Sequence, residues 1–174
     1  SEYMKKYYER MSHCDFSEKA YVMPCFNERF NEIEMRKKNY EKNIFTYVGS
    51  LDLWQCFDKT VDVYKEIEKN IPDSQLKVLT FQVDEAKSIL ENKGIRNYSV
   101  KQVPKEQVKQ EIRECTYGFI LREDNVVNRV ATPTKISSYL SMGVIPIFSE
   151  CLVDFNSISE RYNIGYSVNS RVDI

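Results

Sequence analysis

Four side chains suited to binding an anion lie close together in the sequence: Arg122, Asn128, Arg129 and Lys135. Three of them carry a positive charge, and the amide of the fourth can donate hydrogen bonds. They surround a Thr-Pro pair that predicts the start of a helix, and the free N–H groups and positive dipole end of a helix start favour phosphate. This combination predicts a site for a phosphate-bearing ligand.

An ordinary surface turn is the alternative for the same segment. Arg122 and Arg129 would then pair with the neighbouring carboxylates of Glu123 and Asp124 in a solvated loop. Exposed loop charges are the usual case in proteins, which favours this interpretation. On the residues alone, both interpretations stay open.

These residues belong to a predicted strand–loop–helix–strand unit. Its successive parts are a strand over Tyr117–Leu121, a polar loop over Arg122–Ala131, a helix from Thr132 to Gly143 and a strand over Val144–Phe148. Thr132 can cap the helix, and Pro133 fits the first helical position because the N–H that it lacks would be unpaired there. Such a crossover makes the two strands parallel neighbours. The loop is therefore expected at the carboxyl edge of the sheet, where open α/β sheets bind ligands.

The rest of the chain alternates strand and helix in the same way. Further strands are predicted from Ile44 to the glycine turn at Gly49, and over Leu76–Phe81, Tyr98–Val103 and Gly165–Val168. Helices are predicted over residues 1–11, Leu53–Ile71, Asp84–Lys93 (with Asp84 as its cap) and after Pro104, and a helix or loop over Cys151–Tyr162. Strict alternation predicts an α/β fold with a parallel sheet of about six strands and helices on both faces. Five glycines leave no G-x-G-x-x-G or Walker loop.

Composition narrows the classes of function. The chain has 174 residues and a net charge of −1, which argues against a nucleic-acid partner because phosphate backbones require a basic surface. No apolar run approaches membrane-spanning length and no signal peptide opens the sequence, so we expect a cytoplasmic protein. Peripheral association of the full-length protein with the inner face of the cell membrane stays open. Five unclustered cysteines favour a reducing compartment, and His13, the only histidine, is poorly placed for a catalytic triad.

Three stretches, taken in order, resemble one enzyme family. They are YVGS followed by a Trp-bearing helix, QVPKEQV after the third strand, and NRVATPTKISSYLSMGVIPI. Together they resemble the C-terminal, donor-binding, Rossmann-like domain of family 4 glycosyltransferases with the GT-B fold, of the bacterial polysaccharide-assembly type. The resemblance covers roughly residues 21–168.

The resemblance implies a function for the whole enzyme. A retaining glycosyltransferase of this kind moves a hexose from a UDP- or GDP-linked sugar to an acceptor glycan or lipid-linked glycan during synthesis of capsule, O-antigen or exopolysaccharide. It usually needs no metal and no cofactor, so cations and a helix start must neutralise the leaving diphosphate.

The resemblance also implies a division of the chain. Residues 1–43 would be a leading helix and a connecting segment from an N-terminal acceptor domain that is not part of this sequence, and residues 44–174 the nucleotide-sugar-binding domain. We expect such a fragment to bind donor weakly and to be inactive alone, because half of the cleft is absent.

Individual residues take roles from the same resemblance. Arg129 and Lys135 are expected to be catalytic, by neutralising the leaving diphosphate. The expected donor-binding residues are Gly49, Ser50, Val103, Arg122, Asn128, Arg129, Pro133, Thr134, Lys135 and Ser138. The missing side chain of Gly49 would let the backbone approach phosphate, and Val103 would line the base pocket mainly through its backbone. No metal ligands are expected.

Four positions depart from the family pattern. Ser50 and Gln55 stand where many relatives have arginine and lysine, and Val130 and Ser138 stand where the family has a pair of glutamates. A serine can make one hydrogen bond to a ribose, whereas a carboxylate can accept two from a diol. The alternative function is therefore a degenerate glycosyltransferase-like binding module without catalytic activity.

Two further classes share the alternating pattern. One class is a flavodoxin-like or receiver-type domain. A receiver would need acidic residues at the end of the first strand, and FTYVGS has none. A sugar-nucleotide epimerase would be expected to use acid and base residues in its cleft, where His13 offers little help.

Overall fold

The computed structural model describes residues 1–23, 29, 32, 35 and 38–169. Six strands form one sheet in the order β3-β2-β1-β4-β5-β6, and all neighbouring strands are parallel. The strands are β1 (Ile44–Val48), β2 (Gln75–Leu79), β3 (Tyr98–Lys101), β4 (Tyr117–Ile120), β5 (Ile145–Ser149) and β6 (Tyr166–Val168). The predicted fold class, a Rossmann-like parallel sheet of about six strands, is confirmed.

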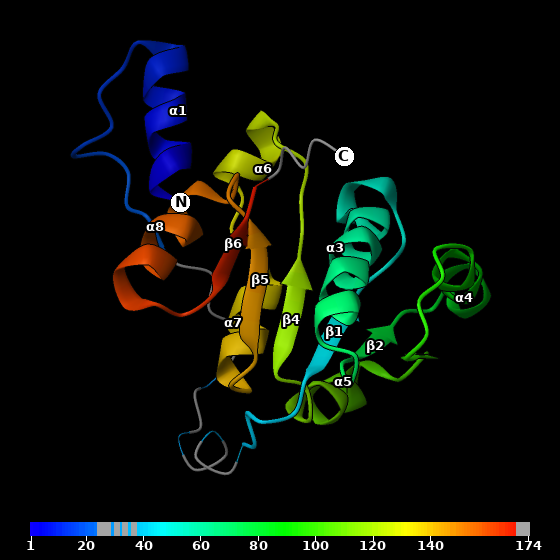
Figure 1. Ribbon diagram of the computed structural model, residues 1–174. Helices are drawn as coiled ribbons and strands as arrows, with labels where there is room; N and C mark the ends of the chain where they lie inside the picture. The colour runs from blue at the N-terminus through cyan, green and yellow to red at the C-terminus, as the bar shows by residue number, and fades with distance from the viewer. Residues whose placement is uncertain (24–28, 30–31, 33–34, 36–37, 170–174) are drawn as a thin grey trace.

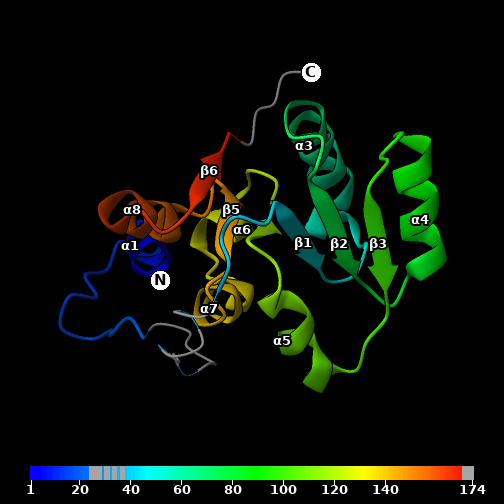
Figure 2. The same ribbon diagram turned by 60° about the horizontal axis from the view of Figure 1, so that its bottom comes forward.

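Helices cover both faces of this sheet, as Figure 1 and Figure 2 show from two directions. They are α1 (Glu2–Ser12), the 3-10 helix η1 (Leu53–Gln55), α3 (Phe57–Asn70), α4 (Val83–Asn92), α5 (Lys105–Arg113), α6 (Val126–Val130), α7 (Thr134–Ser141) and α8 (Val153–Tyr162). α3 and α4 pack on one face, and α5, α7 and α8 pack on the other. No helix among the described residues is long and apolar enough to cross a bilayer.

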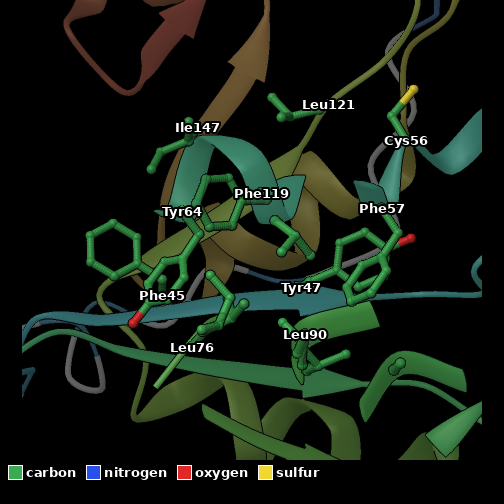
Figure 3. Packing of buried hydrophobic residues seen from close by; sticks show 14 residues of the cluster. Phe45, Tyr47, Cys56, Phe57, Tyr64, Leu76, Leu90, Phe119, Leu121 and Ile147 are labelled. Atoms are coloured by element: carbon green, nitrogen blue, oxygen red, sulfur yellow. The ribbon is translucent and has the colours of Figure 1, made fainter. Parts of the chain in front are cut away.

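The central strands contribute to a hydrophobic core on each face. Phe119 of β4 packs in the cluster under α3, and the next residue, Ile120, packs in the cluster under α7. Ile147 and Phe148 of β5 divide between the two clusters in the same way. Figure 3 shows the first cluster, which side chains of β1, β4 and α3 fill together. Because both faces are buried, these strands are nearly continuous apolar runs in the sequence.

The strand order reverses between β1 and β4, which creates a crevice at the carboxyl ends of these two strands. Gly49 follows β1, and Leu121 and Arg122 follow β4, so the turn and the polar loop both lie at this crevice. The predicted position of the loop at the carboxyl edge of the sheet is confirmed.

Helix α1 lies against α6 and α8 at one side of the molecule (Figure 1). The Ser1 hydroxyl donates a 2.9 Å hydrogen bond to the Val130 carbonyl, and the Tyr3 backbone N–H donates a 3.0 Å bond to Asp154 Oδ1. Much of the predicted connecting segment falls on residues 24–28, 30–31, 33–34 and 36–37, which lie outside the described residues. The division of the chain at residue 43 stays a prediction.

The prediction of one long helix over Leu53–Ile71 is wrong for its first turn. η1 ends at Cys56, whose φ of 53° is left-handed, and α3 begins only at Phe57. A left-handed residue cannot continue a right-handed helix. Trp54, which lies within the predicted helix, is 58% exposed. The sequence has no glycine or proline at this break, and its apolar spacing continues across it. The pattern therefore predicted a single helix.

The polar loop after β4 contains a short helix, α6, that the sequence pattern did not predict. Asn125 caps α6, because its side-chain oxygen accepts a 2.9 Å hydrogen bond from the backbone N–H of Asn128. The five-residue helix has two adjacent valines, which are weak helix formers, so its sequence gave no clear helical signal.

Two predicted helix caps are also wrong. α7 begins at Thr134, and Pro133 occupies its N-cap in an extended conformation (φ −61°, ψ 124°) without a side-chain hydrogen bond. Because a residue before proline avoids the helical region, Thr132 stays outside the helix and does not cap it. Similarly, Gln82 rather than Asp84 is the N-cap of α4, and Asp84 lies in the first turn.

Candidate functional site

Lys135 projects from the first turn of α7 toward the turn after β1. Its Nζ donates a 2.7 Å hydrogen bond to Gln55 Oε1 and lies 5.6 Å from the centre of the Tyr47 ring. A Cβ atom on Gly49 would stand 2.7 Å from this nitrogen, and the φ of Gly49 is 152°. Glycine is therefore required here both by the backbone and by the space that the ammonium occupies.

Arg122 supplies a second positive charge beside Lys135. Its side chain is buried, with 6% of the residue exposed, and its guanidinium lies 5.4 Å from the centre of the Trp54 ring. Nη1 donates a 2.7 Å hydrogen bond to the Leu121 carbonyl, and the backbone N–H donates a 2.8 Å bond to Ser149 Oγ. These contacts fix the guanidinium at the carboxyl end of β4.

Neither of these two cations has a carboxylate partner within the part of the chain that the structure describes. Burial, together with the nearby positive charge of Arg122, lowers the pKa of Lys135 to about 7. Burial also lowers the pKa of Arg122. A buried cation, Arg122, and a partly buried one, Lys135, without a counterion among the described residues make a site that favours an anion.

A groove of about 770 Å³ reaches Arg122 from the side of α3. Its walls come from α3 and from the carboxyl ends of β4, β5 and β6, and they include Val63, Ile67, Leu121 and Val168. Arg122 and Ser149 line the groove together with charged residues of α3, namely Lys59, Asp62, Lys65 and Glu66. The groove therefore connects the buried guanidinium with the surface of the molecule.

Arg129 has a different environment from Arg122, although both belong to the same loop region. Its Nε and Nη2 donate hydrogen bonds of 2.6 and 2.8 Å to the two carboxylate oxygens of Asp124. These bonds raise the pKa of Arg129, whose side chain is 43% exposed. The surface pairing considered for the two arginines is thus found for Arg129 and Asp124, but not for Arg122.

Asn128 is buried and serves the fold of the loop. Its Nδ2 donates a 2.8 Å hydrogen bond to the Glu123 carbonyl, and its backbone N–H bonds to the Asn125 side chain. These two bonds hold α6 against the end of β4. The side-chain amide donor is therefore already used within the protein.

The other predicted site residues lie in the turn after β1, in the first turns of α7 and after β3. Ser50 follows Gly49, and its Oγ donates a 2.5 Å hydrogen bond to Asp52 Oδ2. Pro133 and Thr134 begin α7, and Ser138 Oγ donates a 3.5 Å bond to the Thr134 carbonyl one turn earlier. Val103 follows β3, at the far end of the strand order, and packs against the second hydrophobic cluster.

The structure thus brings Gly49, Arg122 and Lys135 together from three separate segments. It adds three residues to which sequence reasoning gave no role in the site: Tyr47, Trp54 and Gln55. Gln55 was noted only as a departure from lysine. Lys135 of α7 contacts Gln55. A cation is therefore present near the position where many relatives have a lysine, but it comes from another part of the chain.

Comparisons with known proteins identify the fold. No protein-family model matches the sequence, and neither does any curated protein sequence. The structure is similar to a mutant of TarM from S. aureus in complex with fondaparinux, alpha-GlcNAc-glycerol and UDP (TM-score 0.67, 9% identity, 95% of this chain and 32% of that chain). It is also similar to the GtfA/B complex (TM-score 0.65, 11% identity, 98% and 34%). A third neighbour is WaaG, a glycosyltransferase involved in lipopolysaccharide biosynthesis (TM-score 0.59, 13% identity, 80% and 37%).

These similarities show that the chain has the fold of a Rossmann-like domain of GT-B glycosyltransferases. The chain spans about one third of the length of each neighbour. The GT-B part of the expected resemblance is confirmed as a fold, whereas membership of family 4 and the polysaccharide-assembly type stay predictions.

Proposed function

We propose that this chain is the donor-binding domain of a glycosyltransferase and that its crevice binds the diphosphate of a UDP- or GDP-linked sugar. The observation that carries the proposal is the pair of uncompensated cations, the buried Arg122 and the partly buried Lys135, at the switch point of a GT-B-type sheet. A diphosphate is a compact dianion, and it would supply the negative charge that the protein itself does not place there.

The chemistry follows from the same two residues. In a retaining transfer, the bond between the sugar and the diphosphate breaks, and the diphosphate leaves with the electron pair. Lys135 and Arg122 would stabilise this growing negative charge, and the N–H groups at the start of α7, near Pro133 and Thr134, would add to it. Arg129 would support the loop through Asp124, and its own contact with the diphosphate stays a prediction.

The biological role extends beyond this chain. We propose bacterial surface polysaccharide synthesis, with an acceptor glycan or lipid-linked glycan held by another domain of the full-length protein on the cytoplasmic side of the membrane. The WaaG neighbour, which takes part in lipopolysaccharide biosynthesis, supports this role. The TarM complex, which contains UDP, supports a nucleotide sugar as donor.

The test is a titration of the chain with UDP, GDP, UDP-glucose, UDP-GlcNAc and GDP-mannose, followed by heteronuclear NMR. Saturable shifts at Gly49, Lys135 and the indole N–H of Trp54 are expected with one base class. The absence of shifts from all five ligands at millimolar concentration would contradict donor binding.

A second assay separates an enzyme from a non-catalytic binding module, the alternative that Val130 and Ser138 suggest. The full-length protein should turn over a donor, and Lys135→Met should reduce its kcat. Saturable donor binding without turnover of any donor would favour the binding module.

A further inference from the structure

Two adjacent residues of the η1 turn contact the two cations of the site, Arg122 and Lys135. The ring of Trp54 lies over the Arg122 guanidinium at 5.4 Å, and Gln55 Oε1 accepts the 2.7 Å bond from Lys135 Nζ. The left-handed residue Cys56 ends η1 directly after these two side chains. The break in the predicted helix therefore aims both side chains at the crevice instead of at the face of α3.

Gln55 is suited to orient an ammonium without neutralising it. Only 6% of the residue is exposed, and its amide oxygen is a strong acceptor without a charge. A glutamate of the same size would place a full negative charge on the same nitrogen. A neutral hydrogen-bond acceptor thus fixes the position of the Lys135 ammonium.

The other groups around Lys135 do not supply a compensating charge. Tyr47 of β1 presents the face of its ring, and Arg122 at the end of β4 is itself a cation. Tyr139, the titratable neighbour on α7, is buried, and burial raises its pKa, so it stays neutral. Asp52, on the η1 side, accepts its hydrogen bond from Ser50.

We propose that Gln55 is a positioning residue that holds the ammonium of Lys135 over Gly49, uncompensated, until a nucleotide diphosphate binds there. This inference rests on the proposed function and deepens it, because it assigns the preformed geometry of the diphosphate site to one side chain. Gln55 acts through Lys135 and is not itself assigned a contact with the ligand.

This arrangement couples the binding of a diphosphate to the protonation of Lys135. Because the pKa of Lys135 is lowered to about 7, most molecules carry a neutral amine at this residue above that pH. A bound diphosphate favours the ammonium form and raises this pKa. Affinity for a nucleotide sugar should therefore fall as the pH rises from 7 to 8.5, by up to about tenfold for one coupled proton.

The experiment compares the wild-type chain with Gln55→Glu and Gln55→Met, using UDP-glucose and GDP-mannose as ligands. The diphosphates of both ligands keep a constant charge between pH 7 and 8.5. Trp54 is the only tryptophan in the chain, so its fluorescence reports directly on the site. Gln107→Glu, on the exposed surface of α5, is the matched control for the change of charge.

Gln55→Glu should weaken binding at pH 7 by about tenfold or more and make the affinity nearly independent of pH, because the new carboxylate keeps Lys135 charged and competes with the diphosphate. Gln55→Met should weaken binding but keep the pH dependence, because it removes the acceptor without adding a charge. Gln107→Glu should behave like the wild type.

The possible failures are distinguishable. If the wild type binds a nucleotide sugar but Gln55→Glu binds it equally well with the same pH dependence, the role of Gln55 is overturned and the donor site stands. If neither ligand binds the wild type at millimolar concentration, the donor site itself is overturned. Circular dichroism of each variant confirms that the chain is folded before titration.

Discussion

Two lysines of this domain lie in opposite electrostatic environments. Lys77 of β2 is 7% exposed, and its ammonium forms salt bridges of 3.1 Å with both Glu111 and Glu114. Burial lowers the pKa of Lys77, but the hydrogen bonds that it donates to the two carboxylates outweigh burial and raise the pKa overall. The ammonium of Lys135 donates its hydrogen bond to the neutral amide of Gln55, and its pKa is lowered.

Under the proposed function, this difference separates a structural charge from a charge that binds a ligand. The fold compensates Lys77 completely, under α5 and away from the carboxyl edge of the sheet. It leaves Lys135 uncompensated at the switch point, where α/β sheets bind ligands. A buried charge without a partner is costly, so its presence in a crevice points to a ligand that brings the missing charge.

The largest expected effect comes from Lys135→Met. Hydrogen bonds between charged groups contribute about 1.5–3 kcal/mol, so the affinity for UDP should fall by about 10- to 100-fold. The free energy of unfolding should stay unchanged or rise, because the substitution removes an uncompensated buried charge. Calorimetric titration and urea unfolding measure the two effects. A loss of stability without a loss of affinity would make Lys135 a structural residue.

Lys77→Met should show the reverse pattern. It leaves the partly buried Glu111 without its main partner and should lower the free energy of unfolding by about 1–3 kcal/mol, with the affinity for UDP unchanged. The hydrogen bond from Lys77 lowers the pKa of Glu111. The stability from this pair is therefore present above the ordinary pKa of a glutamate and is lost as the pH falls through the lowered value. In urea unfolding between pH 6 and 3, the variant should lose less stability than the wild type.

The pH dependence of stability on the alkaline side tests the environment of Lys135 alone. Since the folded pKa is about 7 and that of an unfolded lysine is about 10.4, the unfolded chain binds more protons between these values. The wild type should therefore gain stability relative to Lys135→Met as the pH rises above 7, by about 1 kcal/mol per pH unit. Parallel curves for the two proteins between pH 7 and 9 would mean that the ammonium is not desolvated.

Gly49→Ala probes the space that Lys135 occupies. The new Cβ would stand 2.7 Å from Nζ, so the ammonium must move, and UDP affinity should fall by roughly tenfold. Since Nζ is the end of a flexible side chain, the loss of stability should come from the backbone conformation and should be about 1 kcal/mol. Gly94→Ala is the control, because Gly94 also has a positive φ (74°) but no atom lies near its added Cβ.

The smallest effect is expected for Arg129→Ala. Asp124 already engages its guanidinium through two hydrogen bonds, so UDP affinity should change by less than about threefold. A loss as large as that of Lys135→Met would restore the diphosphate role that the sequence resemblance gave to Arg129. The same titrations provide the measurement.

The fold was largely predictable because its signals are local. The apolar runs of β4 and β5 and the Gly turns at Gly49 and Gly143 mark elements directly in the sequence. The break at Cys56 was not predictable, since cysteine rarely adopts a positive φ and the apolar spacing continues through it. This break decides where Trp54 and Gln55 point.

The site was predictable only in part, because its partners are distant in the sequence. Arg122 and Arg129 look alike in the sequence, and only the packing beside Trp54 shows that one of them is buried. Gly49 lies in the turn after β1, as the sequence predicted, and its missing side chain makes room for Lys135. The bond between Lys135 and Gln55 joins residues 80 positions apart, which no spacing rule could reveal.

The most direct test of the account is an NMR titration of the Lys135 side chain, through its Cε and Nζ resonances, with and without saturating UDP. We expect a pKa of about 7 for Lys135 in the free chain and a clear upward shift when UDP binds. An ordinary lysine pKa in the free chain, or an unchanged value in the presence of UDP, would contradict the claim that Lys135 is held uncompensated for a diphosphate.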